Sequence, residues 1–491
     1  MDSALSLNAA SDAGDVRRAD YRLIIPAGCA WLGVACGLWS LPAPIFFGAL
    51  LILVGIGLFI WRGALYTVIS VAFVSGVGFV CGWIQLTAFE NDPAANLPAK
   101  YPTVLEVELT SDPQRRETKW GTTGSWQADA TIVSVAGEPS SAGVLLRGSD
   151  LEELSRWDKA EVFGDLRKGF RDSPPDVGVF QVRSVRNMQE VTGVGALSNR
   201  IRDTFQTMVA RYPDYAASLI PGMAVGDLRQ MDKSLRDAMI ATSLVHLTAV
   251  SGAHLSMALG VLGAIIPGGR VVRAVVAVAF AALLVCVVGP SPSVLRASIM
   301  CGVTSWGLAG RRKGQPQSTL ALVVLVCVLG SPWMAIEYGF ALSVLATFGL
   351  LFSGRHLIKK WRVENKIAKF FVEAGVITLA AQLWALPVLV TLDDSLPILS
   401  PLANILVAPA VMVVTVLGMA AAAAVIPFPG LAELLCLLAV PFAGWIDFVA
   451  RELAGWSISR LPWFTGIIGI VCAALLICLV VVWQVRSEAK A

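Results

Sequence analysis

Hydrophobic segments about 20 residues long recur along most of this chain and limit what it can fold into. A helix of about 20 apolar residues is long enough to cross the hydrocarbon core of a bilayer. The composition agrees, because 56% of the 491 residues are hydrophobic and 15% are charged, whereas soluble domains are about 45–50% apolar and about 25% charged. The sequence therefore predicts a polytopic α-helical membrane protein.

We place about twelve membrane spans in the sequence. They are 23–40, 42–61, 64–88, 246–266, 271–289, 291–310, 318–331, 334–353, 372–392, 398–425, 429–447 and 463–484. The segment 318–331 is short, and 398–425 contains Pro401 and Pro409. Either one is therefore a candidate for a re-entrant or kinked segment.

Residues 90–190 interrupt this pattern and hold most of the densely spaced charge. Five short alternating stretches occur there, separated by Gly, Pro, Ser and Asp: 103–109, 128–135, 143–147, 159–166 and 179–185. This pattern is typical of a small all-β barrel or sandwich with five or six strands. Between this region and the later spans, residues 194–208 repeat apolar side chains at helical spacing, which predicts an amphipathic helix that lies at the membrane surface or covers the helical bundle.

The distribution of basic residues predicts the orientation of the chain. If the N-terminus is inside and twelve spans alternate, inner loops hold clusters such as residues 311–313, whereas short outer loops hold only Arg451 and Arg460. By the positive-inside rule, both termini are cytoplasmic and the β region is extracytoplasmic. The predicted domains are an N-terminal transmembrane segment (1–89), an extracytoplasmic β domain (90–190) and a second transmembrane domain with leading amphipathic helices (191–491).

The charge of the β region disagrees with a nucleic-acid groove. It holds 12 Lys and Arg against 17 Asp and Glu, whereas barrels that bind single strands combine a basic groove with stacking aromatics. Trp120, Trp126 and Trp157 are candidates for stacking. The favoured alternative is a structural or partner-docking barrel whose tryptophans belong to its core.

Ionisable groups within or at the mouths of hydrophobic segments are the first functional candidates, because charge is costly in lipid. They are Asp227, His246, His254, Arg296, Glu337, Glu373, Asp393 and Asp394. Ser251 lies between the two histidines. Eight residues at about 100° each bring His254 back to within about 80° of His246, so both are expected to face one side of a helix.

Arg296 has two interpretations. It lies about six residues into the span 291–310, and a guanidinium binds phosphate through two parallel hydrogen bonds. The alternative is structural, with Arg296 in a salt bridge to Glu337 or Asp394 between helices.

Neither metal binding nor hydrolysis is the favoured chemistry. Two histidines and Asp227 are of ligand type, but their spacing matches no zinc signature and HExxH is absent. We favour histidines that are hydrogen-bonded between helices. Ser251 and His254 suggest a hydrolase, but GxSxG is absent and three-residue spacing on a helix rarely gives a catalytic angle.

Several short motifs follow one another over residues 220–410. Gly226-Asp227, then His246-Leu247, then residues 250–254 (VSGAH), resemble the GD … HLLAISGLH core of the ComEC-type competence channel family. Further matches are residues 292–297 (PSVLRA), 331–332 (SP), 338–343 (YGFALS), 381–382 (AQ), 386–387 (LP) and 400–404 (SPLAN). Ala253, Ser331 and Ala341 depart from the residues usual in the family.

The resemblance implies a channel that carries single-stranded DNA across the cytoplasmic membrane during natural transformation. It implies an OB-like domain at 90–190 and a competence channel domain at 191–491. The path candidates are then Asp227, His246, Ser251, His254, Arg296 and Glu337. The implied partners are single-stranded DNA, an extracytoplasmic DNA receptor, a cytoplasmic ATPase or helicase, the lipid bilayer and a separate nuclease, and a homo-oligomer stays open.

One feature of many family members has no match in the sequence. Those members end in a metallo-β-lactamase-like domain with an HxHxDH metal motif, and this chain has no such motif. It also has no GxxxxGK[ST] loop. We therefore predict no enzyme activity, no catalytic residue, no metal and no cofactor. The alternatives from other classes are a small-solute transporter and, less favoured, an intramembrane hydrolase.

Overall fold

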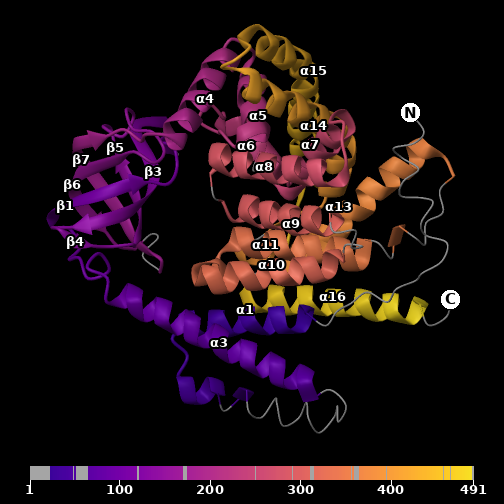
Figure 1. Ribbon diagram of the computed structural model, residues 1–491, viewed down its shortest axis with the longest axis horizontal. Helices are drawn as coiled ribbons and strands as arrows, with labels where there is room; N and C mark the ends of the chain where they lie inside the picture. Colours follow the sequence, from indigo (N-terminus) through magenta and orange to yellow (C-terminus); the bar gives the residue numbers. More distant parts are fainter. Residues whose placement is uncertain are drawn as a thin grey trace.

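The computed structural model contains a β-rich domain at one end of a bundle of helices (Figure 1). It describes residues 23–47, 49–50, 65–118, 121–169, 174–248, 250–289, 291–309, 315–354, 357–358, 364–393, 395–456, 458–464 and 466–488. Most of the predicted span 42–61 lies outside these residues, as do Trp120 and Asp394.

The other eleven predicted spans each fold mainly as helix. The helices are α1 (Ile24–Leu38), α3 (Leu65–Glu90), α7 (Gly252–Ile265), α8 (Arg270–Val288), α9 (Pro292–Ala309), α10 (Pro316–Gly330), α11 (Tyr338–Gly349), α13 (Lys366–Leu392), α14 (Ser400–Ala424), α15 (Pro429–Ala454) and α16 (Gly466–Glu488). Within the described ranges, six helices are long and apolar enough to cross a membrane: α3, α8, α13, α14, α15 and α16. The chain is therefore a helical membrane protein, and the total of twelve spans stays a prediction.

The β-rich domain is a closed barrel with additional short strands. Its strands are β1 (Pro102–Leu109), β2 (Gln114–Thr118), β3 (Gly121–Val135), β4 (Glu138–Pro139), β5 (Gly143–Gly148), β6 (Lys159–Arg167) and β7 (Asp176–Gln189). The path β1-β6-β7-β5-β3 closes because β1 also pairs with β3. Pairings along this path are antiparallel except for the parallel pair β5–β7. Closure leaves these five strands without a free edge.

The predicted alternation accounts for the core of this barrel. Each of the five alternating stretches lies within a strand. In β1, the buried Leu105, Val107 and Leu109 alternate with the half-buried Glu106 and Glu108. Successive side chains of a strand point to opposite faces, so the apolar set fills the interior of the barrel.

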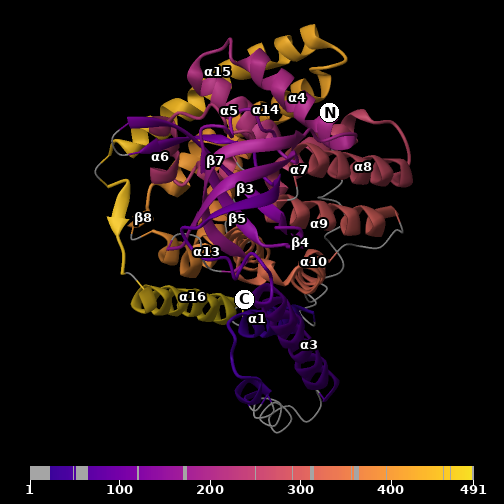
Figure 2. The same ribbon diagram turned by 90° about the vertical axis from the view of Figure 1, so that its left-hand side faces the viewer.

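Three shorter helices, α4 (Val194–Val209), α5 (Asp214–Val225) and α6 (Lys233–Ala241), follow the barrel. Figure 2 shows the barrel in front of the bundle, with α4 above it. Helix α4 packs against the bundle through Phe205 and Val209. Burial along the rest of α4 does not follow the predicted apolar stripe. Val194 and Leu197 are exposed, whereas Arg202 is only 2% exposed.

The β domain supplies the ion-pair partner that permits the burial of Arg202. Asp112, in the loop after β1, forms an ion pair with Arg202. Asn199 on α4 donates to the carbonyl oxygen of Arg156 (2.8 Å), and the Arg156 guanidinium donates to the carbonyl oxygen of Val288 at the end of α8. The barrel is therefore joined to the bundle through polar contacts that helical periodicity does not reveal.

Helices α1 and α3 approach each other closely through glycines. Gly33 and Gly37 on α1 are four residues apart, as are Gly78 and Gly82 on α3. A Cβ added at Gly37 would lie 2.3 Å from the carbonyl oxygen of Phe79. Small residues at this spacing allow the backbones of membrane helices to pack, which is a main source of helix association in lipid.

Gly37→Ala should separate α1 from α3, because the added methyl group meets backbone atoms that cannot rotate away. Overpacking of this kind costs about 1–3 kcal/mol. The control is Gly28→Ala on the same helix, where an added Cβ meets nothing within 4 Å. We expect the thermal unfolding midpoint of the purified protein to fall only for Gly37→Ala, and equal midpoints would contradict this packing.

Candidate functional site

The candidate site is the turn that leads into α7. His246 lies in a 3₁₀ turn, η2 (Val245–Leu247), and α7 begins at Gly252 after the extended Ser251 (φ −124°, ψ 172°). The predicted common helix face for His246 and His254 is therefore wrong, because the extended residue separates η2 from α7. The two environments also differ, since His246 is exposed and His254 is 1% exposed.

Ser251 and His254 form a capping box at the start of α7. The Ser251 side chain accepts the backbone N–H of His254, and Nδ1 of His254 accepts the backbone N–H of Ser251 at 3.1 Å. Since Nδ1 accepts, only Nε2 of this ring can carry a proton. The pair thus satisfies two N–H groups that a helix start otherwise leaves without a partner. A catalytic role is not needed to explain this arrangement.

The ring nitrogens of His246 have different hydrogen-bond roles from those of His254. Its Nδ1 lies 2.7 Å from the carbonyl oxygen of Ser243, and a carbonyl can only accept, so Nδ1 donates. In the neutral ring, Nε2 is then left as an acceptor on an exposed side chain.

Arg296 on α9 reaches the first turn of α7 and is 6% exposed. Its Nε donates to Oγ of Ser343 on α11 (2.8 Å), and its Nη1 contacts Sδ of Met300 (3.4 Å). A Cβ added at Gly252 would lie 3.5 Å from Nη2. The structure therefore brings together residues from three separate sequence segments, at 252, 296 and 343.

The salt bridge considered for Arg296 does not form with Glu337. No carboxylate among the described residues lies within 4 Å of the Arg296 guanidinium, whose contacts are Ser343 and Met300. Glu337 instead occupies the position before α11, where its carbonyl oxygen accepts the N–H of Ala341 (3.0 Å).

Asp227 lies in the loop between α5 and α6 and is 1% exposed. It receives Nε and Nη2 of Arg229 at 3.1 and 2.7 Å, and Nη1 of Arg229 also donates to Asp203 on α4 (2.7 Å). Burial favours the neutral carboxyl, but the hydrogen bonds from Arg229 and the charge of Arg202 outweigh burial and lower the pKa of Asp227. Asp227 is therefore a buried structural anion whose ion-pair partner is Arg229.

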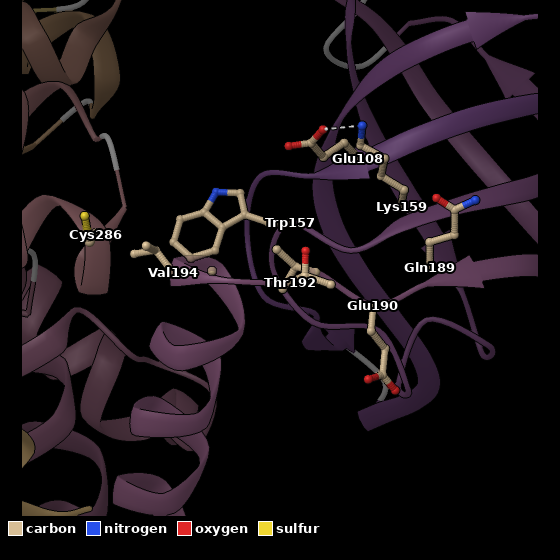
Figure 3. Close-up of a pocket in the computed structure, with 10 residues that line it drawn as sticks. Glu108, Trp157, Lys159, Gln189, Glu190, Thr192, Val194 and Cys286 are labelled. Carbon is tan, nitrogen blue, oxygen red and sulfur yellow. Dashed lines mark ion pairs between the residues drawn. The ribbon is translucent and has the colours of Figure 1, made fainter.

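A pocket of about 650 Å³ lies where the barrel meets α4 and α8. Figure 3 shows Trp157 projecting between the barrel strands and Val194 and Cys286 of the helices. The charged residues of its lining are Glu108, Lys159 and Glu190, and Lys159 pairs with Glu108 at 3.6 Å. With two carboxylates and one ammonium group, the charge of the lining disfavours binding of a phosphate in this pocket. Trp126, the other described candidate for stacking, packs against the barrel core.

Within the described ranges, no group of three or more His, Cys, Asp or Glu side chains is placed to hold a metal ion. The three residues of ligand type considered in the sequence analysis, His246, His254 and Asp227, each have a different hydrogen-bond partner.

Ser251→Ala should destabilise α7, because it removes the cap oxygen, whereas Ser251→Asn should not. Loss of a cap costs about 0.5–2 kcal/mol, and Asn caps about as well as Ser. The check is the thermal unfolding midpoint of both variants. Equal losses would show that the hydroxyl acts as something other than a cap.

Asp227→Asn should be strongly destabilising, because it removes the buried carboxylate that Arg229 binds and leaves Arg229 only the exposed Asp203 as an ion-pair partner. Breaking a buried ion pair costs about 3–5 kcal/mol. The pKa is lowered in the folded state, so the contribution of Asp227 is present above the unfolded pKa of about 3.9 and is lost as pH falls further. The measurement is the unfolding midpoint at neutral pH.

Asp203→Asn is the matched control, since Asp203 shares Arg229 but its side chain is 51% exposed. Exposed pairs contribute about 0–1 kcal/mol. Similar losses in both variants would contradict a buried role for Asp227.

The comparisons with known proteins agree with the motifs. The sequence model of the family described as "Competence protein" matches residues 223–486, which is more than half of the chain. The "ComE operon protein 3" of Bacillus subtilis (strain 168) is 27% identical over 200 residues, which cover 40% of this chain and 25% of that protein. No solved structure matches the chain. The chain belongs to the competence protein family.

Proposed function

We propose that this protein is a channel that carries single-stranded DNA across the cytoplasmic membrane during natural transformation. Its family supports a role in competence. The observation that carries the channel proposal is Arg296, a buried cation without a carboxylate partner among the described residues. An unbalanced charge among membrane helices is costly. The phosphodiester groups of a passing strand would supply the opposite charge.

The β domain fits the same proposal as an OB-like, extracytoplasmic docking domain. Five strands that close into a barrel support the OB-like assignment. Its excess of acidic residues and the packed Trp126 favour docking of a partner, such as an extracytoplasmic DNA receptor, over binding of the strand itself. With both termini cytoplasmic, a cytoplasmic ATPase or helicase would supply energy and a separate nuclease would degrade the other strand.

The test is DNA import in a transformable host that lacks this gene. Labelled duplex is added, and the surface-bound, extracytoplasmic and cytoplasmic label are measured separately. We expect the deletion strain to bind label without importing it. Arg296→Gln should lower the cytoplasmic label about 10–100-fold, because hydrogen bonds to charged groups contribute about 1.5–3 kcal/mol. Protein levels are compared by immunoblot.

Arg211→Gln is the matched control, since Arg211 is exposed and pairs with Glu433 at the surface. It should import normally. If the deletion strain itself imports label at the normal rate, DNA transport is the wrong function and the small-solute transporter becomes the favoured alternative.

A further inference from the structure

The first turn of α7 offers two unused backbone donors. The first N–H groups of a helix have no acceptor within it, and they form the positive end of its dipole. The capping box takes the N–H of His254, but no acceptor among the described residues takes the N–H of Gly252 or Ala253. Ala253 is exposed and Gly252 is half-buried.

An independent observation is the orientation of Arg296 toward this turn. Ser343 and Met300 hold Nε and Nη1 of the guanidinium. Its Nη2 has no hydrogen-bond partner among the described residues and lies beside Gly252. A side chain that is 6% exposed therefore directs an unused donor to the helix start.

These two features repel each other, since both are positive. A positive helix end beside a buried cation is unfavourable, and an anion between them would relieve the repulsion. An anion with several oxygens can accept from Nη2 and from both backbone N–H groups at once, which is how phosphate binds at helix starts.

Gly252 makes this approach possible. A methyl group at this position would lie 3.5 Å from Nη2 of Arg296 and 3.6 Å from Cβ of Ala297. Those are ordinary van der Waals distances, so the folded backbone tolerates the methyl group. It would occupy the space that an oxyanion needs.

We propose that Nη2 of Arg296 and the N–H groups of Gly252 and Ala253 form a binding site for one phosphate oxyanion. The assignment of that oxyanion to a phosphodiester of DNA rests on the proposed function. A lipid headgroup shares the same chemistry and is the other source.

The experiment compares Gly252→Ala with Gly260→Ala in the purified full chain in a maltoside detergent. Both changes add one methyl group to α7, and at Gly260 nothing lies within 4 Å of it. The probe is a fluorescent oligothymidylate followed by anisotropy, beside a peptide nucleic acid of the same sequence, which has no phosphate. We expect the Kd for oligothymidylate to rise about tenfold in Gly252→Ala only. The weak binding of the uncharged probe should not change.

A second arm adds phosphatidylglycerol and follows the unfolding midpoint. If Gly252→Ala abolishes stabilisation by this lipid and leaves oligothymidylate binding unchanged, the phosphate site holds and its source is the lipid. If both variants behave like the parent protein in both arms, the site is overturned. If Gly252→Ala loses oligothymidylate binding but cells that carry it import DNA normally, the site stands and its place on the DNA path fails.

Discussion

A charge buried among helices in a membrane needs an opposite charge, and this requirement organises the contacts described above. Two arginines are buried among the described residues, Arg202 and Arg296. Arg202 meets Asp112, and this pair joins α4 to the barrel. Arg296 meets a hydroxyl and a thioether instead. Since an unpaired buried charge is strongly destabilising, and no described carboxylate pairs with Arg296, we propose that its counter-charge comes from a ligand.

The barrel contacts Val288, which lies near the turn that leads into α7. The Arg156 guanidinium donates to the carbonyl oxygen of Val288. A Cβ added at Gly226 would lie 3.3 Å from Val288 and 3.8 Å from Val250, the residue before Ser251. Gly226 adopts a left-handed conformation (φ +70°), which ends α5 without a side chain in this space. The contact between the barrel and α8 therefore lies close to the segment that leads into α7.

Periodicity and length predict most of the elements, because burial in lipid or in a barrel core imposes a simple pattern on the sequence. The helices and the five main strands lie where the apolar and alternating stretches predict them. The helix starts are harder, as α7 begins at Gly252 although its apolar segment begins six residues earlier. The extended Ser251 decides this, and a cap is a local hydrogen-bond pattern that hydropathy does not register.

Contacts between distant segments are the part that one sequence does not reveal. Arg296 and Ser343 are 47 residues apart, and nothing in either segment indicates that they meet. The same holds for Asp112 and Arg202, whose pairing reverses the expected exposure of α4. The close packing of α1 on α3 differs, since its paired glycines at four-residue spacing are a recognisable signal for helix association.

The capping box links the structural and functional interpretations of α7. Ser251 and His254 each satisfy one backbone N–H, which fixes the helix start and accounts for both side chains without a catalytic role. The N–H groups of Gly252 and Ala253 are then the ones without an acceptor among the described residues. The cap therefore directs the positive end of α7 toward Arg296, and a site for an anion follows from the same two residues that a catalytic interpretation would claim.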